Sequence, residues 1–344
     1  MDYAFTTSLV SEMLREYGKL TRAAMREYLP AREPRQYLYD LVTDYPQRGG
    51  KMMRPSLCIA TARAFGAGPD DALQTAVAIE LLHNALLIHD DIEDGSEMRR
   101  GLPTLHVLHG VPLALNAGDT LTLMCLRPLI ENRSTIGERL AFRIIEETER
   151  MARECAEGQA MELGWRQYNA SAIDDADYLS MVLKKTCWLA TIYPIRVGAL
   201  IGSHDRVDLD PFVRFGFFLG AAFQIQDDLL NLVADERYGK EINGDLWEGK
   251  RTLMLIHASR ESTPEEQLRL TSILSRSREA RSESEVDWMR ELIDKYGCTE
   301  YARQIAQELA GAALHEFSLL AAELPDSRDK SFLEQVVTWV IERT

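Results

Sequence analysis

The chain has 344 residues, of which 46% are hydrophobic and 27% are charged, a balance that excludes a disordered protein and predicts a large buried core. Its formal net charge of −15 disfavours binding to nucleic acid or to an anionic membrane surface, because both require a basic footprint. Any anionic substrate must therefore meet positive charge that is concentrated locally.

The five cysteines are scattered along the chain without a Cys-x-x-Cys pair or the dense spacing of a disulfide framework. This pattern predicts reduced thiols and a cytoplasmic location. The first 20 residues carry acidic side chains among apolar ones, which is not typical of a signal peptide. No apolar stretch reaches the ~20 residues that a membrane-spanning helix needs, so we expect no transmembrane segment.

Apolar residues recur at helical spacing almost throughout, while alternating strand-like stretches are scarce. No Pro-, Gly- or Ser-rich linker separates two independent cores. The sequence therefore predicts an all-α fold in which residues 1–344 form one domain, a compact helical bundle. Turn signals divide the predicted helices at 46–50, 66–69, 101–103, 203–211 and 239–249.

The first turn places Lys51 and Arg54 beside two glycines in the stretch RGGKMMRP. Backbone N–H groups exposed at such a turn can bind phosphate together with the two cations. Either basic residue taken alone is more commonly a surface side chain.

The stretch LLHNALLIHDDIEDGSEMRRG follows, where a predicted helix ends in the first acidic segment, residues 90–94. Asp90 and Asp94 are four residues apart and share one helical face, where like charges repel each other. The C-terminal end of a helix also disfavours anions, so this cluster indicates a bound cation. Carboxylate oxygens with room for water and phosphate suit Mg²⁺, with Asp91 as a further candidate ligand. An isolated motif of this kind is more often a solvated acidic turn.

A second acidic segment, residues 227–231, ends another apolar run, FGFFLGAAFQIQDDLLNL. Asp227 and Asp228 begin it and Asn231 ends it. Two such segments on facing helices would enclose a cavity with apolar walls and an acidic mouth. That cavity would suit an apolar chain that ends in a metal-bound diphosphate.

Three lysines lie near these segments in the sequence: Lys185, which precedes Thr186, and Lys240 and Lys250, which bracket a long polar loop. Each would more often be a surface residue. Their association with two acidic segments is what suggests binding of diphosphates, since an enzyme that acts on diphosphates needs both metals and cations.

Together these segments resemble the trans-isoprenyl diphosphate synthases over nearly the whole chain. The ordered elements are GGKMMRP, HDDIEDGSEMRRGLPTLH, EGQAMEL, KKTCW, FQIQDD and GDLWEGKRTL. The resemblance implies an all-helical enzyme that extends an allylic diphosphate by condensing it with isopentenyl diphosphate. It also implies three bound Mg²⁺ ions and a homodimer.

The resemblance further implies roles for individual residues. The isopentenyl diphosphate would bind Lys51, Arg54, His83 and Arg100, and the allylic diphosphate would bind Arg99. The principal magnesium ligands would be Asp90, Asp94 and Asp227, with Asp91 and Asp228 beside them. The leaving diphosphate would bind Lys185, Lys240 and Lys250, while the oxygens of Thr186 and Gln224 would face the allylic cation. The same pattern places Gln159 near the first metal site.

Two positions depart from the family pattern. The second acidic segment ends in Asn231 where an aspartate is common, and Met52 stands where many members have another basic residue. Two alternatives stay open: a class I terpene cyclase, which would not need the cations for a second diphosphate, and a modulatory subunit, which would be expected to have lost its metal ligands.

Product length is predicted from the helix that precedes Asp90. In the family, aromatic residues at the fourth and fifth positions before the first aspartate give short products, and here those positions hold Leu86 and Ala85. Leu82 and Leu81 lie about one turn deeper, and one turn of ~5.4 Å is comparable to one isoprene unit. We therefore expect geranylgeranyl diphosphate, with a longer product as the alternative.

Overall fold

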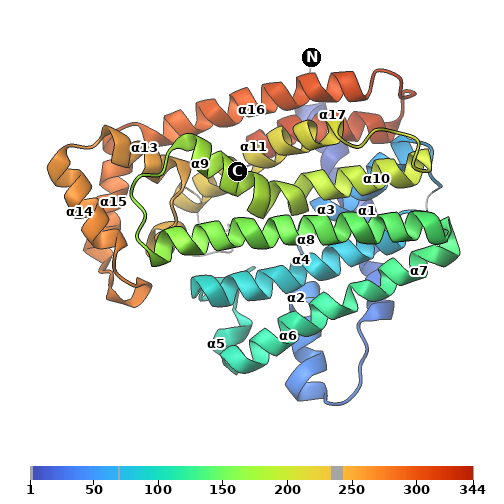
Figure 1. Cartoon of the computed structure of the whole chain (residues 1–344), viewed down its shortest axis with the longest axis horizontal. Coiled ribbons are helices and arrows are strands. Elements are labelled where there is room, and N and C mark those ends of the chain that lie inside the picture. The colour runs from blue at the N-terminus through green and yellow to red at the C-terminus, as the bar shows by residue number, and fades with distance from the viewer. Residues whose placement is uncertain (1–2, 69, 234–242, 344) are drawn as a thin grey trace.

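The computed structural model describes residues 3–68, 70–233 and 243–343. Most of these residues lie in helices, which confirms the predicted all-α fold (Figure 1). The first half of the chain forms α1 (Tyr3–Met25), η1 (Arg26–Tyr28), η2 (Arg35–Tyr39), α2 (Asp40–Gln47), α3 (Met53–Ala64), α4 (Leu73–Asp94), α5 (Leu105–His109), α6 (Val111–Met124), α7 (Leu126–Ile136) and α8 (Glu138–Gln167).

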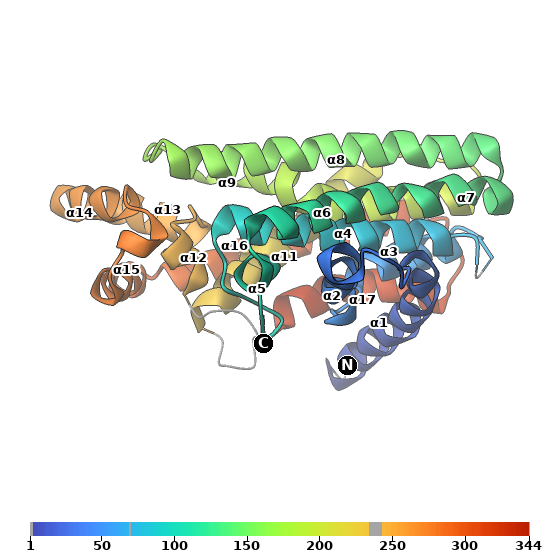
Figure 2. The same cartoon turned by 90° about the horizontal axis from the view of Figure 1, so that it is seen from below.

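The second half continues the bundle. It forms α9 (Asp175–Val182), η3 (Leu183–Ile192), α10 (Tyr193–Ser203), α11 (Pro211–Val233), α12 (Gly244–Glu248), α13 (Leu253–Glu261), α14 (Pro264–Leu274), η5 (Arg278–Ala280), α15 (Glu283–Lys295), α16 (Cys298–Leu320) and α17 (Arg328–Glu342). Figure 2 shows α14 and α15 projecting from one end of the long helices.

The long helices pack in pairs around one continuous core of buried apolar residues. Helix α4 packs against α6, α8 against η3, and α11 against both η3 and α16. Small residues allow the closest of these contacts: a Cβ added at Gly158 of α8 would lie 2.2 Å from the backbone nitrogen of Lys185. Gly158 therefore brings α8 directly against η3, the segment that carries Lys185 and Thr186.

A short hairpin follows α4 and consists of β1 (Met98–Arg99) and β2 (Leu102–Pro103), paired antiparallel. Its two central residues, Arg100 and Gly101, have φ values of 56° and 75°. Two successive positive φ angles are typical of the tight turns that join hairpin strands. The hairpin therefore holds Arg99 and Arg100 close to the end of α4.

All five cysteines are buried and unpaired, as their spacing predicts. Within the described ranges, the structure contains no helix with the length and apolar character needed to cross a membrane.

Candidate active site

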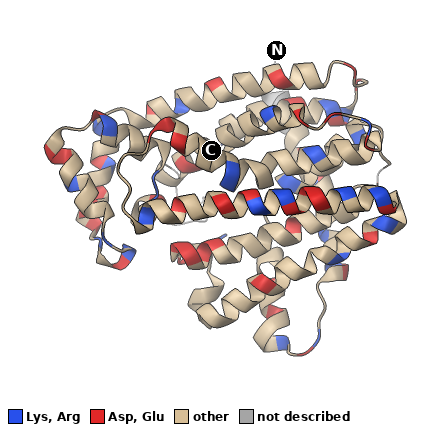
Figure 3. Ribbon diagram, viewed as in Figure 1, with Lys and Arg blue, Asp and Glu red and all other residues tan. Residues whose placement is uncertain are grey.

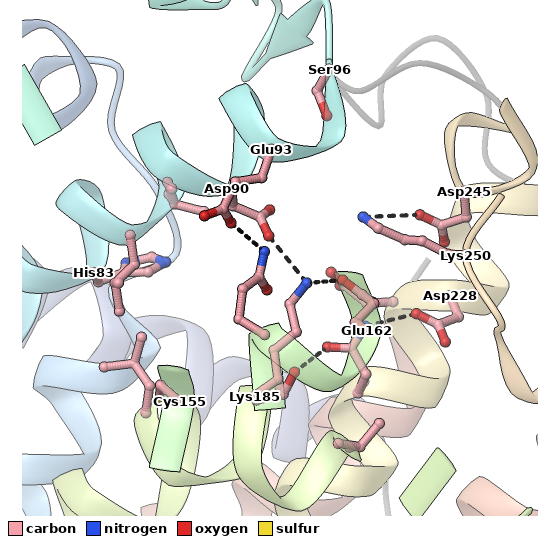
Figure 4. Close-up of a pocket in the computed structure, with 18 of the residues that line it drawn as sticks. His83, Asp90, Glu93, Ser96, Cys155, Glu162, Lys185, Asp228, Asp245 and Lys250 are labelled. Carbon is pink, nitrogen blue, oxygen red and sulfur yellow. Dashed lines mark hydrogen bonds and ion pairs between the residues drawn. The ribbon is translucent and has the colours of Figure 1, made fainter. Parts of the chain in front are cut away.

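A cavity of about 890 Å³ lies where the ends of α4 and α8 meet η3, α11 and the segment after α12. Acidic, basic and apolar side chains line it, and Figure 4 shows the charged groups of Asp90, Glu162 and Lys185 close together. Figure 3 shows how acidic residues gather at the C-terminal end of α4. The two predicted acidic segments therefore meet at one cavity.

Asp90 lines the cavity from the last turns of α4, and its carboxylate lies 3.2 Å from Lys185 Nζ and 3.5 Å from Arg99 Nη2. Burial alone would raise the pKa of Asp90, but Lys185, Lys250 and Arg99 together hold it well below its usual value. Asp90 is therefore ionised and is surrounded by positively charged side chains.

Asp94 lies one turn later on the same helix, and its side chain is fully buried. Its carboxylate is bound by the Arg166 guanidinium and lies 2.7 Å from Lys250 Nζ. Burial raises the pKa of Asp94, but the positive charge of Lys250, Lys185 and Arg166 outweighs this effect and lowers it. Asp90 and Asp94 thus share one face as predicted, but cations bind both carboxylates, and Asp94, unlike Asp90, is not among the residues that line the cavity.

Asp91 has a different environment from the one predicted for a metal ligand. Its buried carboxylate accepts hydrogen bonds from the Tyr45 hydroxyl at 2.5 Å and from Arg99 Nε at 2.9 Å, and Asp91 is not among the residues that line the cavity. The physical reason is helical periodicity, because a residue next to Asp90 points about 100° away from it. In this structure Asp91 therefore anchors Arg99.

The second acidic segment lies across the cavity, at the end of α11. The Asp227 side chain is 26% exposed and lies 3.2 Å from Arg343 Nη1. Asp228 is buried and accepts hydrogen bonds from the Tyr178 hydroxyl at 2.8 Å and from Gln224 Nε2 at 2.7 Å. Burial raises the pKa of Asp228 to about 6, against the effect of these two donors.

Asn231, the departure from the family pattern, is used structurally. Its side-chain oxygen accepts a hydrogen bond from the Asp245 backbone N–H at 3.0 Å, and its own carbonyl accepts one from Asn243 at 3.0 Å. Asn231 therefore fastens the start of α12 to the end of α11.

Two of the three predicted lysines line the cavity. Lys185 binds the Glu162 carboxylate in addition to Asp90, and Lys250 lies 2.8 Å from Glu248 and 3.8 Å from Asp245 (Figure 4). Burial would lower the pKa of each lysine, but the surrounding carboxylates raise both. Both ammonium groups therefore remain charged. Lys240 lies outside the described residues.

Thr186 and Gln224 line the cavity next to these charges. The Thr186 hydroxyl donates a hydrogen bond to Gln224 Oε1 at 2.8 Å, so the two oxygens are in direct contact. The structure thus brings together the two residues that the resemblance assigned to the allylic cation.

The four residues predicted to bind the isopentenyl diphosphate line the same cavity. Lys51 lies in the turn before α3, Arg54 lies in α3, His83 lies in α4, and Arg100 lies in the turn of the hairpin. Lys51 lies over the Trp339 ring, and Arg100 donates to the Tyr45 carbonyl at 3.0 Å. Arg54 Nε is buried without a hydrogen-bond partner among the described residues, which leaves a donor for an anion. Burial lowers the pKa of His83 to about 4, so its ring is neutral near pH 7.

The predicted chain-length residues do not share one face. Leu86 lines the cavity, whereas the lining residues do not include Ala85, Leu82 and Leu81, which are buried in the packing. Leu86 lies four positions before Asp90 and thus on its face, but Ala85 lies five before, which rotates it by about 140°. Of this set, therefore, only Leu86 is placed at the cavity.

The apolar part of the cavity is instead completed by helices α8 and η3. The apolar residues contributed there are Ala152, Cys155, Ala156, Ala160, Leu163 and Leu189. In Figure 4, Cys155 lies on the side of the cavity away from Lys250.

Several residues at the site were not predicted. Glu162 and Arg166 lie in or next to the EGQAMEL stretch, and Asp245 and Glu248 lie in the GDLWEGK loop, so the motifs themselves could have indicated them. Tyr178 and Arg343 contact the second acidic segment from 50 and 116 residues away in the sequence. No local pattern indicates such distant partners.

The donor set fits magnesium that is shared with a substrate. Within the described residues, no three His, Cys, Asp or Glu side chains form a ready-made metal cluster. Mg²⁺ usually takes one or two carboxylates, several waters and substrate phosphate oxygens, so it does not require such a cluster. Asp90 and Asp227 offer partly exposed carboxylates to the cavity, as this mode of binding requires.

Comparison with known proteins gives the same assignment. Residues 35–293 match the model of the polyprenyl synthetase family. A short chain isoprenyl diphosphate synthase of Methanothermobacter thermautotrophicus is 33% identical, over 97% of this chain and 98% of that protein.

Two solved structures are also similar. The geranylgeranyl pyrophosphate synthetase of Pyrococcus horikoshii has a TM-score of 0.84 and 32% identity, covering 98% of this chain and 99% of that one. The polyprenyl synthase of Caulobacter crescentus, solved with calcium and isoprenyl diphosphate, has a TM-score of 0.83 and 27% identity, covering 97% and 98%. The chain therefore belongs to the polyprenyl synthetase family and is a trans-prenyltransferase.

Proposed function

We propose that this enzyme condenses isopentenyl diphosphate with an allylic diphosphate and releases geranylgeranyl diphosphate as its main product. The observation that carries the proposal is that two sets of cations line one cavity. Lys185 and Lys250 lie beside the first acidic segment, and Lys51, Arg54 and Arg100 line the same cavity. A cyclase would not need the second set.

Different side chains bind the two diphosphates. Lys185 and Lys250 hold the allylic diphosphate and stabilise the negative charge that develops as its carbon–oxygen bond breaks. Asp90, Asp94 and Asp227 would hold three Mg²⁺ ions, which supply further neutralisation of that charge. Asp94 would exchange its contacts with Arg166 and Lys250 for a metal contact.

The allylic cation then forms beside Thr186 and Gln224, whose oxygens present negative potential to it. The double bond of isopentenyl diphosphate, held by Lys51, Arg54 and Arg100, attacks this carbon and forms the new carbon–carbon bond. The proton lost from the adduct passes to the released diphosphate, because burial lowers the pKa of His83 to about 4 and so makes this ring a weak proton acceptor.

The proposed product length is supported by Leu86 and the apolar side chains of α8 and η3 that line the cavity. The experiment is incubation with isopentenyl diphosphate and each short allylic diphosphate, followed by chromatography of the dephosphorylated products. We expect the twenty-carbon alcohol to dominate. A dominant chain of twenty-five carbons would mean that the cavity extends further.

Leu86→Phe tests which residue limits the chain, with Ala85→Phe as the matched control on the neighbouring position. An aromatic ring at 86 enters the cavity and should shorten the main product by one unit. A ring at 85 enters packed core, where overpacking costs about 1–3 kcal/mol of stability, and should leave product length unchanged. Shortening by Ala85→Phe alone would contradict this orientation of α4.

A homodimer is the assembly we propose, and it is supported by an exposed apolar surface over α5, α6, α7 and the start of α8. Its residues are Val107, Leu108, Val111, Leu115, Leu123, Leu126, Ile130 and Phe142. Exposed apolar side chains that form a contiguous patch mark protein interfaces, and these residues recur along neighbouring helices. Leu123→Glu should give a monomer by light scattering, whereas Leu268→Glu, at an exposed position on α14, should not. We also propose that the enzyme works in the cytoplasm, in keeping with its five unpaired cysteines.

A further inference from the structure

Four polar side chains form a continuous hydrogen-bonded chain along one wall of the cavity. The Tyr178 hydroxyl donates to Asp228 Oδ2 at 2.8 Å, and Gln224 Nε2 donates to Asp228 Oδ1 at 2.7 Å. The Thr186 hydroxyl then donates to Gln224 Oε1 at 2.8 Å. The four residues come from α9, η3 and α11, and all of them line the cavity.

This chain has a defined direction because an ionised carboxylate can only accept hydrogen bonds. Asp228 receives one donor on each oxygen, so the atom of Gln224 that faces it must be the amide nitrogen. The amide oxygen of Gln224 is therefore turned the other way, toward Thr186. An amide that faces a carboxylate in this manner cannot rotate by 180° without losing a donor and placing two acceptors in contact.

Burial strengthens the constraint. Asp228 is 6% exposed and Tyr178 is 1% exposed, so water cannot readily replace either partner. Asp227, the neighbouring carboxylate, is the more exposed of the two acids at 26% of its side chain and contacts a cation instead. The two adjacent aspartates therefore have separate environments.

We propose that Asp228 is a positioning residue that fixes the carbonyl oxygen of Gln224 toward the allylic carbon, and that Tyr178 holds Asp228 in place. The inference rests on the proposed prenyl transfer, in which positive charge develops on that carbon. Thr186 uses its hydrogen for Gln224, so its lone pairs also face the site. A fixed pair of oxygens stabilises the cation without having to reorient during the reaction.

A double-mutant cycle tests the proposal with Asp228→Asn, Gln224→Leu and the combination. Asparagine has nearly the same shape, but its amide can donate to Gln224 Oε1 and so allows the glutamine to turn over. Asp228→Asn should lower kcat about 10- to 100-fold, while both KM values and the magnesium concentration for half-activity change by less than about twofold. In the Gln224→Leu background the same substitution should have little further effect, because the residue through which it acts is gone.

Two outcomes of the cycle would overturn the proposal. A large rise in the magnesium requirement of Asp228→Asn would show that Asp228 is a metal ligand, and a full effect on kcat in the Gln224→Leu background would show that Asp228 does not act through Gln224. Tyr178→Phe is the second variant, and it should lower kcat in the same direction but less, with unchanged KM values. Thermal melts check that each variant is folded.

A readout independent of turnover is the NMR signal of the Gln224 side-chain amide in protein labelled with ¹⁵N-glutamine. Its assignment follows from the signal that disappears in Gln224→Leu. The hydrogen-bonded amide proton should move upfield in Asp228→Asn, and an unchanged signal would contradict the proposed orientation. If the parent enzyme failed to join isopentenyl diphosphate to any allylic diphosphate, the proposed function would be wrong, but this signal would still decide the orientation.

Discussion

The two acidic segments have nearly the same sequence pattern, but carboxylates within them have different electrostatic environments. At the end of α4, Asp90 and Asp94 are surrounded by Lys185, Lys250 and Arg166, and their pKa values are lowered. At the end of α11, Asp228 has only neutral donors, and its pKa is raised to about 6. The difference teaches that a shared motif does not imply a shared role for each carboxylate.

Charge compensation explains how the first segment can exist at the C-terminal end of a helix. Anions are unfavourable there, and two carboxylates one turn apart repel each other. Buried ion pairs offset both costs, and the same cations are then available to a diphosphate. The second segment needs less compensation, because Asn231 is neutral and Asp228 is held by Tyr178 and Gln224.

The largest expected effect comes from removing a carboxylate that faces the cavity. Asp90→Ala and Asp227→Ala should each lower kcat by about three orders of magnitude or more, because transition-state charge stabilisation of several kcal/mol is lost. Steady-state turnover with isopentenyl and allylic diphosphates measures the change, with Asp326→Ala as an exposed control. Near-normal rates in either variant would refute its assignment as a metal ligand.

Arg166→Ala should have the next largest effect and act on the first segment alone. The guanidinium binds the Asp94 carboxylate and also donates to the Glu93 carbonyl at 3.0 Å, so it fixes the end of α4. We expect kcat to fall about 10- to 100-fold, which corresponds to a rise of about 1.4–2.7 kcal/mol in the activation free energy. Arg166→Lys should recover part of the activity. An equal loss in the lysine and alanine variants would argue against a positioning role.

A smaller effect should be a pH dependence of the free energy of unfolding that is caused by His83, which lies on α4 two turns before Asp90. Burial lowers its pKa in the folded state to about 4, whereas the unfolded chain binds a proton near pH 6.5. Between these values the unfolded state binds more protons, so stability falls as the pH is lowered through this window, by about 1–3 kcal/mol.

Urea unfolding at a series of pH values measures this fall. His83→Gln should flatten the curve between about pH 6.5 and 4, whereas the exposed His315→Gln should leave it unchanged. An identical slope in the parent and in His83→Gln would show that other groups cause it.

The smallest effect should come from Asn231→Asp, which makes the two segments alike in sequence. An aspartate oxygen can still accept the hydrogen bond from the Asp245 backbone N–H, so the local structure should persist. We expect kcat to stay within about threefold of the parent. A large gain in rate would mean that the missing negative charge limits the reaction.

Much of the fold and the site follows from the sequence because the signals are local. Helical periodicity predicts an all-α bundle, and the spacing of Asp90 and Asp94 predicts their common face. The glycine turn before Lys51 and the polar loop before Lys250 were also recognisable in the sequence, and both lysines line the cavity. Each of these features depends on residues within a few positions of one another.

Tertiary structure decided which carboxylates face the cavity and what binds them. Asp91 turns to Tyr45, Asp228 to Tyr178 and Asp227 to Arg343, and none of these partners is a sequence neighbour. The same holds for the apolar end of the cavity, where α8 and η3 contribute more than the predicted face of α4. Local spacing fixes the angle between two side chains on one helix, but the packing of the helices decides which face of each helix lines the cavity.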